Sequence, residues 1–177
     1  MAAEAAEAAV AGKARLFALL ALFAGGTALG AGATLTTADL AGRYTRTFRT
    51  GLVSGENYMA TDVVTVVATS RTRALVNFDL TFFNGHICSL TGIARLEGRA
   101  LVYRRPGRFA GDPPCILRLW RQGARLRWNA DNNSCREDCG ARGSFTDGGM
   151  RWSSRRPISR AGRARILRDF ERIRNLP

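Results

Sequence analysis

Four cysteines and a single histidine are the residues of this sequence whose chemistry could define a site. Cys88, Cys115, Cys135 and Cys139 form an even set, and His86 lies two residues before the first of them. An even number of cysteines in an exported domain predicts two disulfide bonds. The alternative is a zinc site from His86, Cys88, Cys135 and Cys139, although Cys-x-x-x-Cys is not the paired Cys-x-x-Cys spacing most typical of zinc.

The sequence leaves the disulfide connectivity open. Our first choice is Cys88–Cys115 with Cys135–Cys139, and the alternative is Cys115–Cys135 with Cys88–Cys139. A cysteine nucleophile would need a free thiol and an orienting base, and an oxidised set of four leaves no thiol. We therefore expect no catalytic residue, no cofactor and no bound metal. A cofactor-free enzyme or a zinc site at the cysteines remains an alternative function.

The stretch 75–96 is expected to position these residues as a β-hairpin. Asn84-Gly85 lies between two β-rich runs, and this dipeptide favours a two-residue type I′ turn. Such a turn places Phe83 opposite His86 and fixes the register of both strands. The face expected to enter the core consists of Val76, Phe78, Leu80, Phe82, Ile87 and Ile93.

Alternating apolar and polar runs predict about eight short strands. They span residues 42–48, 58–69, 75–83, 86–96, 100–104, 115–120, 125–130 and 139–145. Short strands separated by turns at regular intervals are typical of a sandwich or a closed barrel. If consecutive strands are neighbours, the four cysteines and His86 gather at one rim. The hairpin 115–130 is expected to point Leu117, Leu119, Leu126 and Trp128 inward.

The first 33 residues have the layout of a secretory signal peptide. An apolar run (16–29) follows two basic residues and precedes the small residues Ala31-Gly32-Ala33. We expect cleavage there and a periplasmic or secreted protein. Anchoring in the membrane by the uncleaved segment is the alternative, although the run is short for a spanning helix.

The mature protein is strongly basic, with a formal net charge of +13 for the chain. Such a charge favours anionic partners. The composition changes after residue 150, so we expect a barrel domain over 34–150 and a basic tail over 151–177. Within the tail, Ser159 is placed to cap a helix whose apolar stripe includes Ile166, Phe170 and Ile173. This helix is expected either to close one barrel mouth or to bind anionic lipid or a partner groove.

Several basic and aromatic residues are candidates for contacting a partner. The hairpin 115–130 alternates tryptophan with arginine, as a nucleic-acid-binding surface would, but an exported protein rarely meets nucleic acid. We therefore do not expect a nucleic-acid partner. The candidate partner-binding residues are Arg118, Trp120, Arg155, Arg156, Arg163 and Arg165.

Four short segments resemble a group of small exported bacterial β-barrel proteins. The layout of leader, disulfide-bonded barrel and late Cys-Gly is also similar to periplasmic lysozyme-inhibitor-like domains, over roughly residues 40–157. That resemblance implies lysozyme inhibition as an alternative function. The serine- and tyrosine-bearing inhibitory loop of that family has no match here, and a basic domain would be repelled by basic lysozyme. The resembling segments are Asn84-Gly85-His86-x-Cys88, Leu101-Val102-Tyr103-Arg104, Cys139-Gly140-Ala141-Arg142-Gly143 and Ser154-Arg155-Arg156-Pro157-Ile158.

These observations together predict a mainly all-β protein: a small antiparallel β-barrel with an N-terminal signal segment and a C-terminal amphipathic basic helix. We expect it to act as an exported, non-enzymatic binding protein of the cell envelope. The expected partner is an anionic ligand or a protein, with the membrane surface an alternative through the C-terminal helix.

Overall fold

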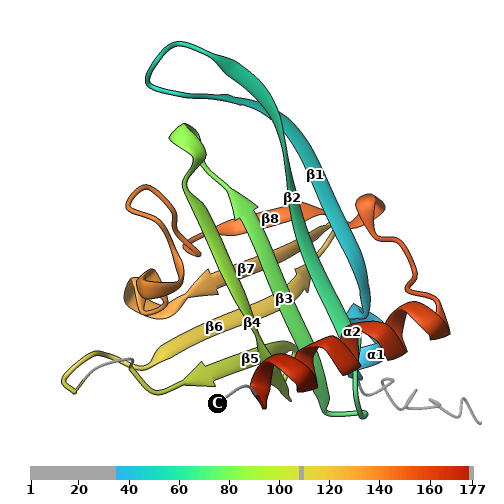
Figure 1. Cartoon of the computed structure of the whole chain (residues 1–177). Coiled ribbons are helices and arrows are strands. Elements are labelled where there is room, and N and C mark those ends of the chain that lie inside the picture. Colours follow the sequence, from blue (N-terminus) through green and yellow to red (C-terminus); the bar gives the residue numbers. More distant parts are fainter. Residues whose placement is uncertain (1–34, 108–109, 176–177) are drawn as a thin grey trace, which may run out of the picture. The chain divides into compact units, whose positions relative to one another are not determined.

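The computed structural model describes residues 35–107 and 110–175. Within them, eight antiparallel strands form a single sheet whose order follows the sequence (Figure 1). The short helix α1 (Thr37–Leu40) precedes the sheet, and α2 (Arg160–Arg174) follows it. The strands are β1 (Gly42–Gly51), β2 (Asn57–Ala68), β3 (Arg73–Thr81), β4 (Ile87–Glu97), β5 (Ala100–Arg105), β6 (Cys115–Gln122), β7 (Arg125–Ala130) and β8 (Gly148–Arg151).

This architecture confirms the predicted mainly-β fold, an up-and-down and nearly closed barrel with a C-terminal helix. The predicted signal segment, residues 1–33, lies outside the described residues. No helix of the described part of the chain is long and apolar enough to cross a membrane.

The barrel interior is filled by apolar side chains that alternate along the strands. Phe78 of β3 packs against Trp128 and Phe145, with ring centroids 5.5 Å and 5.6 Å away. The three side chains are 0%, 2% and 1% exposed. The predicted inward face of β6 and β7 is confirmed, because Leu117, Leu119 and Leu126 are buried with Trp128. Buried side chains thus fill the inside of the barrel.

The turn of the central hairpin differs from the prediction. Asn84 has a φ of 61° within a 3₁₀ turn at Phe83–Gly85, and the Phe82 N–H donates to the His86 carbonyl over 2.7 Å. The loop is therefore longer than a two-residue type I′ turn. The reason is tertiary: the Asn84 side-chain oxygen accepts a hydrogen bond from the Val53 N–H, 3.2 Å away, at the tip of the β1–β2 hairpin.

The longer turn shifts the register by one residue and changes the face of β4. Leu80 pairs with Cys88 rather than with Ser89. Because side chains alternate between the faces of a strand, this shift exchanges inward and outward residues. Ile87 and Ile93, predicted to lie in the core, are 52% and 37% exposed, whereas Cys88 is fully buried.

The last strand also differs from the predicted 139–145. Cys139 pairs with β4 only through an isolated bridge to Cys88, and the eighth strand is β8, which pairs with β7. Gly148 lies directly opposite Trp128, where a Cβ would lie 2.0 Å from the indole ring. A glycine-rich strand is thus required by the bulk of the neighbouring side chain, although glycine disfavours strands locally.

The predicted cap of α2 is present, but the helix lies in a different place. The Ser159 hydroxyl accepts a hydrogen bond from the Gly162 N–H over 3.1 Å. Ile166 lines a common cavity with Thr65, and Thr65 alternates with the inward Val64 and Val66. The first turns of α2 therefore rest against the outer face of the barrel at β2, and not over a barrel mouth.

Candidate functional site

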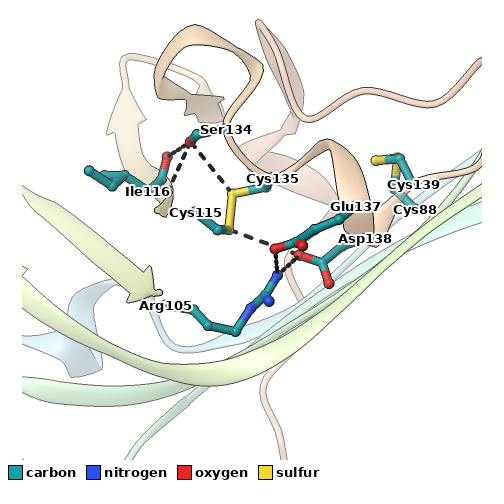
Figure 2. A network of polar contacts seen from close by, with 9 residues as sticks. All are labelled: Cys88, Arg105, Cys115, Ile116, Ser134, Cys135, Glu137, Asp138 and Cys139. Atoms are coloured by element: carbon teal, nitrogen blue, oxygen red, sulfur yellow. Dashed lines mark hydrogen bonds and ion pairs between the residues drawn. A yellow bond between two sulfur atoms is a disulfide. The ribbon is translucent and has the colours of Figure 1, made fainter. Parts of the chain in front are cut away.

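Both disulfides form at the rim where the sequence placed the cysteines (Figure 2). The pairs are Cys88–Cys139 and Cys115–Cys135, so our first choice of connectivity was wrong and the alternative is observed. The pairing follows from the register shift: Cys88 faces inward at the start of β4, where residue 139 bridges to it. The loop between Cys135 and Cys139 contains a 3₁₀ turn instead of a local disulfide.

At the cysteine rim, the described residues place the two disulfides and His86. All four cysteines are in disulfides, so a zinc site or a thiol nucleophile would require their reduction. The described residues contain no cluster of three or more potential metal ligands. His86 lies against Gly140, where a Cβ would come within 2.8 Å of the imidazole Nδ1.

An ion network beside the Cys115–Cys135 bridge anchors the loop that carries it (Figure 2). The Arg105 guanidinium lies 2.5 Å from Glu137 Oε1 and 2.8 Å from Asp138 Oδ2. Burial lowers the pKa of Arg105, but Asp138 and Glu137 outweigh it and raise the pKa overall. The single guanidinium between the two carboxylates holds the end of β5 to the loop.

The predicted pair Arg118 and Trp120 lies on the outer face of β6. Arg118 is bound to Asp131, with Nη2 3.2 Å from the carboxylate. Trp120 pairs with Arg127 across the β6–β7 ladder and is half-buried. The arginine is thus already neutralised by an acidic neighbour, and this pair by itself is a weak candidate for an anionic partner.

The four arginines predicted in the tail lie together, on both sides of Pro157 and Ile158. Arg155 and Arg163 line a cavity of about 580 Å³. Arg156 and Arg165 line a second cavity of about 470 Å³, and both cavities share Pro157 and Ile158. We call these two adjoining cavities the α2 groove. Its other lining residues are Ala38, Ala41, Gly42, Arg43, Thr65, Val66, Val67, Ala68, Gly162, Ile166 and Asp169.

Arg155 is held rigidly in the wall of the α2 groove. Its Nε donates to the Ala41 carbonyl over 2.7 Å and its Nη2 donates to the Ala38 carbonyl over 3.1 Å. Its guanidinium carbon also lies 5.0 Å from the centroid of the Trp152 ring. These bonds use the carbonyls at the end of α1, and they fix the cation without neutralising its charge.

Trp152 links the α2 groove to the barrel core. Its ring packs against Tyr44, with centroids 5.5 Å apart, and Arg121 stacks on it at 4.4 Å. Tyr44 is fully buried and donates its hydroxyl to the Leu40 carbonyl over 2.8 Å. Burial raises the pKa of Tyr44 to about 12, and the nearby Arg155 and Arg121 oppose that rise in part. The floor of the groove is therefore preorganised by packing.

The α2 groove carries an excess of positive charge. Among the described residues, no carboxylate forms an ion pair with Arg163, Arg165 or Arg43. The acidic residue that lines the groove, Asp169, lies 3.0 Å from the guanidinium of Arg172 on the same helix. An apolar floor below cations without carboxylate partners suits a ligand that has an anionic group beside an apolar part.

Sequence reasoning missed the contribution of β1 and β2 to this groove. Arg43 and Thr65 pair with each other across the β1–β2 ladder and point to the helix side. Their alternation with the buried Tyr44 and Val64 signals an outward face, but the sequence does not show that α2 covers that face.

Comparisons with protein-family models, with curated proteins and with solved structures gave no match to this chain.

Proposed function

We propose that this chain is an exported, non-enzymatic binding protein that takes an anionic component of the cell envelope in the α2 groove. The observation that carries the proposal is the convergence of Arg43, Arg163 and Arg165 on one apolar-floored groove without carboxylate partners in the described chain. Cations collected in one concave surface raise the local concentration of anions and strengthen their binding.

The disulfides support the exported location. Disulfides persist in oxidising compartments and are rare in the cytosol. Both bridges are mostly buried, with Cys88 and Cys115 fully buried, so they are integral to the packed barrel. Together with the predicted signal segment, they favour the periplasm or the medium as the site of action.

The test compares two double variants of equal charge change. Arg163→Gln with Arg165→Gln removes two groove cations, whereas Arg49→Gln with Arg136→Gln removes two exposed arginines outside it. The probe is a vesicle containing phosphatidylglycerol, with phosphatidylcholine vesicles as the blank. Each arginine near an anionic surface contributes about 1 kcal/mol, so the groove variant should bind about 30-fold more weakly.

The control variant is expected to lose less than about 3-fold, because its arginines do not face the ligand. Equal losses in the two variants would show that net charge, and not the α2 groove, determines binding.

A further inference from the structure

The barrel does not close fully between its first and last strands. β1 and β8 are the two ends of the sheet, and no ladder of the described residues joins them. Arg43 of β1 instead exchanges backbone hydrogen bonds of 2.9 Å and 2.8 Å with Arg156, which follows β8 in the chain. Beyond this pair, a cavity of about 550 Å³ opens between residues 45–48 of β1 and 149–151 of β8. We call it the seam.

Backbone groups along the seam are free to pair. In an antiparallel ladder, successive residues direct their N–H and C=O groups to opposite sides. Arg43 bonds to Arg156 and so points away from β2, which means that Thr45 and Thr47 also point into the seam. No described group forms a backbone hydrogen bond with the N–H of Thr45 or Thr47 across the seam.

On the β8 side of the seam only the N–H groups are unpaired among the described residues, because the Gly149 carbonyl accepts from Arg125 Nη2 over 3.4 Å and the Arg151 carbonyl accepts from the Ser154 hydroxyl over 2.8 Å. The Trp152 N–H donates to the Ala124 carbonyl over 2.8 Å, so even-numbered residues of this segment face β7. Gly149 and Arg151 therefore direct their N–H groups toward the seam. An unpaired edge of this kind is a template for an added strand.

The side chains beside the seam are positively charged. Arg125 and Arg151 face each other directly across the β7–β8 ladder, an arrangement that destabilises a sheet unless an anion intervenes. Neither arginine forms an ion pair with a carboxylate of the described chain. On the same face, the Nε of Arg127 is buried without a hydrogen-bond partner in the described residues. The seam cation Arg46 is neutralised by Asp62.

We propose that the seam binds an extended acidic segment of a partner protein, which pairs with β1 as an added strand and directs acidic side chains to Arg125 and Arg151. Main-chain hydrogen bonds to Thr45 and Thr47 supply the affinity, and the arginines select the acidic sequence. A second copy of this chain is disfavoured as the occupant, because a two-fold pairing centred on Arg46 would place Arg43 opposite Arg49 of the other copy.

The test uses the full chain and a capped heptapeptide that alternates glutamate and valine, present at millimolar concentration. Binding is measured by calorimetry, and amide hydrogen exchange is measured by NMR. We expect the peptide to bind and to protect the Thr45 and Thr47 amides, while a lysine–valine peptide of equal length does not bind. Two N-methylated peptides, one methylated on every glutamate and one on every valine, distinguish strand addition from charge attraction. One methylated peptide should keep its affinity and the other should lose it, because only every second N–H group of the bound peptide faces β1.

Matched variants separate this surface from the α2 groove. Arg125→Gln with Arg151→Gln should weaken the glutamate–valine peptide about 10-fold, a loss typical of removing two partly exposed charges. Arg163→Gln with Arg165→Gln should leave it unchanged, whereas the vesicle assay should show the reverse. The proposal is overturned if the peptide does not bind, if both methylated peptides behave alike, or if Thr45 and Thr47 gain no protection.

Discussion

The Gly148→Ala substitution tests whether β8 needs a glycine at this position because the Trp128 ring lies against it. A Cβ on Gly148 would lie 2.0 Å from both Cε2 and Nε1 of the indole. Trp128 is 2% exposed and packs edge-on against Phe78, 5.5 Å away between centroids. Any movement of the indole would therefore disturb its packing against Phe78.

The expected cost follows from this geometry. Overpacking a core by one methyl group costs about 1–3 kcal/mol where neighbours can yield. The upper limit is the loss of the packed indole, about 3–5 kcal/mol for truncating a buried tryptophan. A separation of 2.0 Å is far inside van der Waals contact, so we expect about 3 kcal/mol of lost unfolding free energy.

Urea unfolding of the disulfide-bonded protein, followed by tryptophan fluorescence and circular dichroism, measures this loss. Gly98→Ala is the control, because its Cβ would meet nothing within 4 Å and only its φ of +59° is unfavourable. That substitution should cost about 1 kcal/mol. In a Trp128→Leu background the cost of Gly148→Ala should fall below about 1 kcal/mol. An equal cost in both backgrounds would refute the assigned role of the indole.

Three further predictions concern stability. Replacing Cys88 and Cys139 with alanine removes a bridge of sequence separation 51 and should cost about 4 kcal/mol in urea unfolding, by the chain-entropy relation. The neutral form of Tyr44 stabilises the fold fully below the ordinary pKa of 10.0, and this contribution is lost as the pH rises toward about 12. Tyr44→Phe should therefore flatten the fall in unfolding free energy over that range, as measured by urea titration at several pH values. Asp62→Ala strands the Thr81 N–H that donates to the carboxylate over 2.7 Å, and it should cost about 2 kcal/mol in the same assay.

The α2 groove could be predicted only as a set of residues, not as a surface. The sequence predicts the basic character of residues 151–174 and the cap at Ser159, because both depend on residues only a few positions apart. That Arg163 and Arg165 meet Arg43 depends on which face of the barrel the helix covers. The burial of the Arg127 Nε without a hydrogen-bond partner in the described residues likewise depends on contacts between strands.

The sequence by itself determined the number of strands and, for most of them, which residues face inward. Apolar residues at every second position, as in Leu117–Leu119 and Leu126–Trp128, place one face of the strand in the core. It also determined that the four cysteines meet at one rim.

Only the tertiary structure decided the register at Asn84, the disulfide pairing and the position of the last strand. The Asn84 side chain accepts a hydrogen bond from the Val53 N–H of a distant hairpin, and Gly148 leaves room for the Trp128 ring. The register, the pairing and the last strand each depend on contacts between residues far apart in the chain. Local propensity contains no information about such contacts.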